Sequence, residues 1–227
     1  FSPRALRGVT LANRIVVSPM CQYSADNGAA TAWHMIHLGS LALSGAGMLC
    51  LEATAVEPEG RISPDDLGLW DDRCEAALEP VLAAIRRHSP IAVAVQLAHA
   101  GRKASTASPW RGSGQVGPDK GGWVPHAPSP LPYGERDVVP HALDEAGLRR
   151  VRDAFAAAAG RAARLGIDGI EVHAAHGYLL HQFLSPIANR RDDSYGGSLD
   201  NRMRFPLQIL DAVRAAFPAD RPVGVRV

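Results

Sequence analysis

The sequence predicts a parallel α/β fold, on two observations. Five short apolar runs recur along the 227 residues, and each is nearly continuous, which is typical of parallel strands buried on both faces. Helical patterns lie between several of these runs, so strands and helices alternate. With right-handed crossovers, this order is compatible with two architectures, a doubly wound sheet and a (β/α)₈ barrel.

The expected strands come first. In chain order they are Ile15–Ser18, Met48–Val56, Ile91–Val95, Gly169–His173 and Val223–Val227. No G-x-G-x-x-G follows the first of them, which disfavours the dinucleotide-binding form of the doubly wound sheet.

The clearest helix runs from about Asp144 to Leu165. Its apolar residues step by three or four positions and form one stripe: Leu148, Val151, Phe155, Ala158, Ala162 and Leu165. Asp144 is a good N-cap residue and Gly166 a good C-terminal stop.

Two more helices are expected. The first follows Asp71-Asp72, but Pro80 interrupts its pattern, which predicts a kink or a later start. Its apolar positions are Cys74, Leu78, Val81 and Ile85. The second carries Phe205, Ile209, Val213 and Phe217 and ends at Pro218.

A long excursion, residues 99–143, separates the third strand from the helix that follows. It contains seven prolines and seven glycines. Long irregular loops in compact domains are usually functional lids or flexible segments, so we expect this one to cap a pocket within a single domain, 1–227.

Composition excludes several classes of protein. The net charge is +1, which argues against binding through phosphate contacts. No apolar run approaches the roughly 18 residues of a membrane span. Three cysteines without a spacing pattern do not form a disulfide framework, and no signal peptide is evident, so a cytoplasmic location is expected. Cys50 fits a small core side chain.

Polar or reactive groups follow every expected strand. In a barrel, functional residues lie at these carboxyl ends. The groups are Ser18–Tyr23, Glu52–Ala55, Gln96 with His99–Lys103, His173–Tyr178, and Arg226. Each alone has an ordinary structural explanation, but packing gives no reason for all five strand ends to carry such groups.

His173 and His176 are the sharpest of these signals. Two imidazoles three positions apart can donate hydrogen bonds to one anionic oxygen, or can bind a metal if a third ligand joins them. A metal-dependent barrel hydrolase is therefore an alternative on these residues alone.

Four stretches carry a resemblance to a known family. They are Asn13–Tyr23, Gln96–Lys103, Glu171–Tyr178 and Asn189–Phe205. Together they resemble the old yellow enzymes, the FMN-dependent ene-reductases, and are most similar to the bacterial NADPH dehydrogenases and xenobiotic reductases. The resemblance spans all 227 residues. It implies a (β/α)₈ barrel, of which about five strands are present, and we expect the chain to be the N-terminal part of a longer enzyme.

The resemblance also implies a flavin site. FMN would lie at the carboxyl-end mouth of the barrel, against Ser18, Pro19, Met20, Cys21 and Ala53. Gln96 matches the glutamine at the pyrimidine edge of the flavin, and Arg226 the arginine near N1 and the C2 carbonyl, where a guanidinium stabilises negative charge. Cys21 would tune the flavin potential and not act as a nucleophile.

Substrate residues are implied in the same way. His173 and His176 would hold the carbonyl or nitro oxygen of the substrate, Tyr178 would protonate its α-carbon, and Tyr23 would contact the same oxygen. Lys103 lies in a matching motif without an assigned role. The implied reaction passes hydride from NADPH through FMN to an activated C=C bond of an unsaturated carbonyl or nitro compound.

Three alternatives are weighed against it: the metal-dependent hydrolase, a flavin-dependent reductase of RNA uridines, and a non-catalytic remnant. The net charge of +1 and the His173, His176 and Tyr178 set disfavour the RNA reductase. Relatives in this branch imply a homodimer or homotetramer when the protein is full length.

Overall fold

A single curved parallel sheet organises the computed structural model, which describes residues 1–227. Its strand order is β3-β4-β5-β8-β9. The bounds are β3 Val16–Val17, β4 Met48–Ala55, β5 Ala92–Ala98, β8 Gly169–His173 and β9 Val223–Arg226. All five expected strands are therefore present. Their spatial order follows the chain without reversal, as in a (β/α)₈ barrel and unlike a doubly wound sheet.

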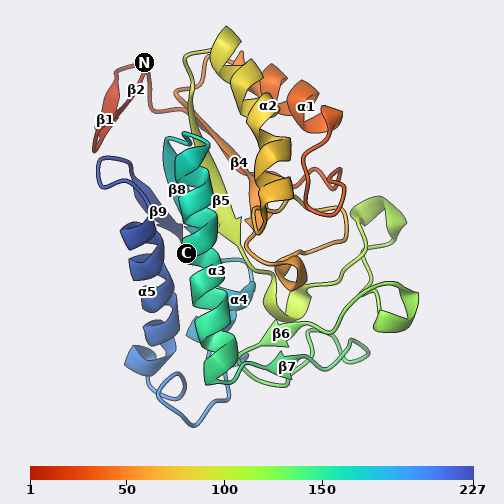
Figure 1. The fold of residues 1–227 in the computed structure, drawn as a ribbon. Helices are drawn as coiled ribbons and strands as arrows, with labels where there is room; N and C mark the ends of the chain where they lie inside the picture. Colours follow the sequence, from red (N-terminus) through yellow and green to blue (C-terminus); the bar gives the residue numbers. More distant parts are fainter.

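Helices connect these strands and lie along one side of the sheet (Figure 1). They are α1 Ala32–Ala42, α2 Asp72–His88, α3 Glu145–Arg164 and α5 Leu199–Ala216. A core of 34 buried residues fills the space between sheet and helices, with Phe155 and Phe205 among its largest side chains. No helix has both the length and the hydropathy needed to cross a bilayer.

Capping explains where the helices begin. Asp144 accepts a hydrogen bond from Gly147 N at 2.7 Å and starts α3 as expected. Asp71 accepts one from Cys74 N at 2.8 Å, and α2 begins directly after it. The later start that Pro80 suggested is therefore wrong, because the helix continues through that proline.

Helix α5 carries the expected Phe205, Ile209 and Val213, and Phe217 is its C-cap residue. Ser198 is its N-cap, accepting from Asn201 N at 3.3 Å, and Pro206 lies inside the helix. The glycine-containing segment before it, Tyr195–Ser198, leads directly into the first turn.

Several elements had no clear signal in the sequence. An antiparallel hairpin, β1 Arg4–Leu6 and β2 Val9–Leu11, precedes the sheet. A two-stranded parallel ribbon, β6 His126–Ala127 and β7 His141–Ala142, lies in the excursion, and the short helix α4 spans Leu179–Leu184. The excursion is tied to the body of the protein, for example by Thr106 N donating to Ile62 O at 2.7 Å.

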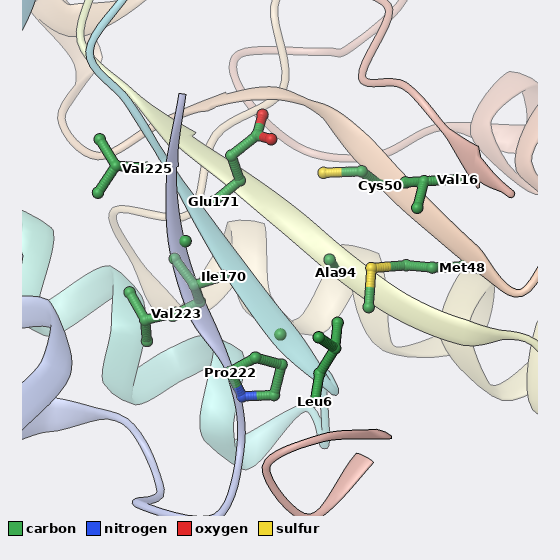
Figure 2. Close-up of a pocket in the computed structure, with 12 residues that line it drawn as sticks. Leu6, Val16, Met48, Cys50, Ala94, Ile170, Glu171, Pro222, Val223 and Val225 are labelled. Atoms are coloured by element: carbon green, nitrogen blue, oxygen red, sulfur yellow. The ribbon is translucent and has the colours of Figure 1, made fainter. Parts of the chain in front are cut away.

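The side of the sheet facing away from the helices carries an apolar hollow, which we call the interior groove (Figure 2). Its lining includes Val16, Met48, Cys50, Ala94, Ile170 and Val225. Leu6 of the hairpin closes one end, beside Pro222. The hairpin itself is held by Gly8 N, which donates to Asp220 O at 2.7 Å. Cys50 is buried here, as expected.

Candidate active site

A second, more polar hollow lies at the carboxyl ends of the strands, and we call it the mouth cleft. Its lining consists of Pro19, Cys21, Ala53, Ile62, Gln96, His173, His176, Tyr178 and Arg226. All of these except Ile62 are residues that the sequence placed at a flavin or substrate site. The structure thus brings together groups that are up to 207 positions apart in the chain, since the cleft runs from Pro19 to Arg226.

Not every expected residue lines this cleft. Ser18 is exposed and Met20 is 50% exposed, and both lie outside the lining. Tyr23 is partly buried, and its ring packs edge-on against Trp110 with centroids 5.7 Å apart. Lys103 lies beside the cleft, where its ammonium is 4.9 Å from the centroid of the Tyr178 ring.

Strand register explains the convergence. Ala53 pairs with Gln96, Gln96 pairs with Glu171, and His173 pairs with Arg226. The register shifts between Leu51 and Ala53, which marks a local irregularity of the kind that re-aims side chains next to functional sites.

Gln96 and Arg226 form the hydrogen-bonding side of the cleft. The Gln96 amide nitrogen donates to Glu171 Oε1 at 2.6 Å, which fixes the orientation of the amide. No hydrogen bond or ion pair within the chain involves the Arg226 guanidinium. A buried, oriented amide beside an unpaired guanidinium suits a ligand edge that presents acceptors and gains negative charge, as the pyrimidine edge of a flavin does on reduction. The donor set therefore fits FMN.

His173, His176 and Tyr178 form an aromatic cluster opposite. The His173 ring centroid lies 5.0 Å from that of His176 and 5.0 Å from that of Tyr178, each pair edge to face. His173 Nδ1 accepts from Ala175 N at 3.3 Å, so the ring proton belongs on Nε2. Burial, with nearby His176 and Arg226, lowers the pKa of His173 to about 4. The imidazole is therefore a neutral donor at neutral pH.

The loop that carries His176 adopts an unusual backbone. His176 has φ +57° and Gly177 φ +76°, in the left-handed region that non-glycine residues rarely adopt. Three hydrogen bonds hold this loop: Lys103 Nζ to His176 O at 3.1 Å, Gln182 Nε2 to Gly177 O at 2.8 Å, and Gly177 N to His181 Nδ1 at 2.7 Å.

Burial keeps two acidic side chains of the cleft in their protonated forms. It raises the pKa of the Tyr178 phenol above its usual range, and Cys21 and Tyr23 add to that effect. It also raises the pKa of the Cys21 thiol, to which Asp66 and Glu52 contribute. Cys21 is therefore a thiol and not a nucleophilic thiolate.

Two buried carboxyl groups near Cys21 support the cleft. Glu52, in β4, accepts from Gln22 N at 2.9 Å and so holds the loop after β3. Asp66 accepts from Ser63 Oγ at 2.6 Å and from Ile62 N at 2.9 Å, which places the Ile62 wall. Burial raises the pKa of Asp66 to about 7. In the sequence, Glu52 is recognisable as a charged residue within an apolar strand, whereas no local pattern identifies Asp66 as a residue that supports the site.

A further network positions the loop after β5. His99 Nε2 lies 2.9 Å from Glu57 Oε1, and its Nδ1 accepts from Gly101 N at 3.0 Å. Arg150 of α3 donates to the same carboxylate at 3.1 Å. Burial alone would raise the pKa of Glu57, but hydrogen bonds from His99 and Arg150 lower it to about 2.

A metal site would need a third ligand beside His173 and His176. No group of three or more His, Cys, Asp or Glu side chains is placed to hold a metal ion. The donor set gives the metal-dependent hydrolase no support.

The whole sequence, residues 1–227, matches the family described as "NADH:flavin oxidoreductase / NADH oxidase family". The chain belongs to this family. Among similar curated proteins are an NADH:flavin oxidoreductase of Gibberella zeae, 45% identical over 233 residues, and an NADPH dehydrogenase of Geobacillus thermodenitrificans, 43% identical over 229. The alignments cover 100% of this chain and 56% and 62% of those proteins. The chain thus spans under two-thirds of the length of these relatives.

Solved structures of the same family have the same fold. Morphinone reductase superposes with a TM-score of 0.85 at 33% identity, covering 100% of this chain and 61% of that one. An old yellow enzyme from Pichia sp. gives 0.86 at 28% identity, covering 99% and 58%. These likenesses confirm the old yellow enzyme family and the barrel fold. Family membership implies FMN as the flavin and a nicotinamide nucleotide as the second cofactor.

Proposed function

We propose that the full-length protein is an NADPH:FMN oxidoreductase that reduces the activated C=C bond of α,β-unsaturated carbonyl or nitro compounds. One observation carries the proposal. The mouth cleft sets two imidazoles and a phenol beside an oriented amide and an unpaired guanidinium. Hydride acceptance by an enone needs both halves, one to hold the flavin and one to stabilise an oxyanion.

FMN would be held by Gln96 and Arg226 at its pyrimidine edge, with Pro19, Cys21 and Ala53 against the ring. Ser18 and Met20 would contact it from the same loop. When bound, FMN would supply the hydride chemistry that links NADPH to an activated C=C bond. The Cys21 thiol, being protonated, can donate only a weak hydrogen bond, which is suited to adjusting the flavin potential.

His173 and His176 would bind the substrate oxygen. Two N–H donors at that atom polarise the conjugated bond and stabilise the negative charge that the oxygen gains. Tyr23 would contact the same oxygen from the loop after β3. A low pKa suits His173 to this task, because a neutral imidazole donor with Nε2–H keeps one protonation state across the physiological range.

Tyr178 would give its proton to the α-carbon. Its raised pKa leaves the phenol protonated at any working pH, and a carbon with enolate character is basic enough to take that proton. Because the nicotinamide and the substrate would occupy one cleft in turn, ping-pong kinetics are expected.

The experiment is a visible spectrum of the full-length protein. We expect a yellow protein that bleaches on anaerobic addition of NADPH and regains its colour with 2-cyclohexenone. A colourless protein that takes up no flavin on reconstitution would overturn the proposal, and stoichiometric zinc without flavin would favour the hydrolase instead.

We also propose a homodimer or homotetramer for the full-length enzyme, which light scattering would check.

A further inference from the structure

We propose that Lys103 is a positioning residue, which sets a positive charge against the ring of Tyr178 and stabilises the phenolate formed when this tyrosine gives up its proton. The inference rests on the proposed role of Tyr178 as proton donor. It assigns a task to a residue that lies outside the cleft lining.

The geometry places the Lys103 ammonium between two aromatic rings. Its Nζ is 4.9 Å from the Tyr178 ring centroid and 5.1 Å from that of Tyr133, which belongs to the excursion. The same ammonium donates to His176 O at 3.1 Å. No carboxylate forms an ion pair with it. The charge is therefore not neutralised by an acid, and apart from the His176 carbonyl its electron-rich neighbours are the two aromatic faces.

The surroundings of Tyr178 disfavour its ionised form, so a nearby cation would stabilise that form. Titratable groups near this tyrosine come from several elements: Cys21 and Tyr23 after β3, Asp66 after β4, Tyr133 in the excursion, and His173 at the end of β8, whose ring centroid is 5.0 Å from that of Tyr178. His176 and Arg226 line the same cleft, and His181 of α4 acts on the neighbouring His173. Burial disfavours a phenolate at Tyr178, and so does the Asp66 carboxylate when it is ionised. Lys103 lies directly over the ring and opposes them.

The chemical step is balanced. The O–H bond of Tyr178 breaks, a C–H bond forms at the α-carbon of the substrate, and the phenolate remains until a solvent proton restores it. A cation over the ring stabilises the charged product of this transfer more than the neutral phenol, so it favours proton release.

The loop bearing Lys103 is rigidly held. Gly101 has φ +62°, and a Cβ built on it would lie 2.4 Å from the Gln182 side chain, so another residue there would displace the loop. The His99–Glu57–Arg150 network fixes the preceding turn. The sequence contains only two lysines, and the other, Lys120, is exposed in the same excursion. Lys120 therefore offers a matched control.

The test uses the full-length holoenzyme with 3,5-difluorotyrosine at position 178, whose greater acidity brings its ionisation into an accessible pH range. Absorbance titration gives its pKa in four proteins: the parent, Lys103→Arg, Lys103→Gln and Lys103→Met. Glutamine keeps a donor for His176 O but has no charge, whereas methionine has neither. We expect both neutral variants to raise the pKa by about one unit, a tenfold change in ionisation, and arginine to retain the parent value.

Kinetics supply the second readout. In otherwise unmodified enzyme, we expect Lys103→Gln to slow oxidation of the reduced flavin by 2-cyclohexenone about tenfold while leaving reduction by NADPH unchanged. Lys120→Gln is expected to change neither quantity.

A Lys103→Gln protein with the parent pKa and the parent rate would overturn the inference and leave Lys103 a purely structural anchor of the loop. Failure of the proposed function is distinguishable. If Tyr178→Phe turned over at the normal rate, Tyr178 would not be the donor, whatever the titration showed.

Discussion

The interior groove and the mouth cleft are built from the same strands, yet the groove is mostly apolar, with Glu171 as its one charged side chain (Figure 2), and the cleft is mostly polar. In β5 the groove takes Ala94 and the cleft takes Gln96; in β8 they take Ile170 and His173. Towards the carboxyl ends, apolar side chains that fill space give way to groups that donate hydrogen bonds or carry charge. Two or three positions along one strand thus separate packing from chemistry.

The difference shows how this fold divides its tasks. The groove is closed by an apolar hairpin side chain, Leu6, whereas the cleft is supported by buried polar networks around Glu52, Asp66 and Glu57. Catalysis should therefore depend on the cleft, whereas substitutions in the groove should change stability alone. Four substitutions or conditions test this division.

The largest expected effect is at Tyr178. Tyr178→Phe should slow reoxidation of the reduced enzyme by an enone about 10²–10⁴-fold, the range for loss of a general acid, with flavin reduction by NADPH unchanged. Stopped-flow absorbance separates the two half-reactions. Tyr195→Phe is the control, since Tyr195 packs against Phe205, away from the cleft lining, and should behave as the parent. Equal rates in the two variants would contradict the assignment.

Gln96 is expected to have the next largest effect. Its side chain lines the cleft and donates a hydrogen bond to Glu171, which lines the groove. Gln96→Leu removes the donor to Glu171 and should lower the free energy of unfolding by about 1–3 kcal/mol, while flavin is retained less tightly. Urea denaturation and flavin release measure these quantities. The control is Gln208→Leu on α5, which removes only a long hydrogen bond, 3.4 Å, from the Tyr195 hydroxyl. It should change the free energy of unfolding by less than about 0.5 kcal/mol. An unaltered flavin affinity in Gln96→Leu would argue against its place at the flavin.

His173 predicts a pH dependence of stability. Its folded pKa of about 4 lies below the ordinary value of 6.5, so below pH 6.5 the unfolded chain binds the proton first. The neutral His173 imidazole therefore makes its full contribution to the free energy of unfolding above pH 6.5, and this contribution is lost as the pH falls towards 4. After discounting for solvent screening we expect about 1–2 kcal/mol. His173→Gln should reduce this loss in urea titrations, whereas replacing the exposed His88 should not.

The smallest effect is expected in the groove. Met48 lines it and is 8% exposed, so Met48→Leu should cost less than about 1.5 kcal/mol. It should leave the steady-state rate of enone reduction unchanged. A large loss of activity without loss of stability would show that the groove takes part in the chemistry after all.

Much of this architecture could be predicted because apolar runs and helix caps act locally. The five strands and the start of α3 at Asp144 follow from such patterns. The strand-end rule gave stretches that contain every lining residue of the cleft except Ile62, and the family resemblance then singled out the individual residues. The later helix start predicted from Pro80 was wrong. The N-cap at Asp71 and the burial of Cys74 and Leu78 stabilise the helix by more than the proline destabilises it.

Other features depend on tertiary contacts that no local pattern reveals. The hairpin strands have three residues each, too few for a periodicity. Asp66 and Ile62 enter the site through a loop whose path is set by hydrogen bonds within it. The low pKa of His173 arises from burial and from neighbours distant in sequence, including Arg226.

We propose that the polar cleft carries out enone reduction. The most direct measurement is anaerobic reoxidation of the reduced full-length enzyme by 2-cyclohexenone, in the parent and in a His173→Ala/His176→Ala variant. We expect recovery of flavin absorbance in the parent and a rate at least about 10²-fold lower in the variant, as for loss of oxyanion donors. No recovery in the parent, or equal rates in both proteins, would contradict it.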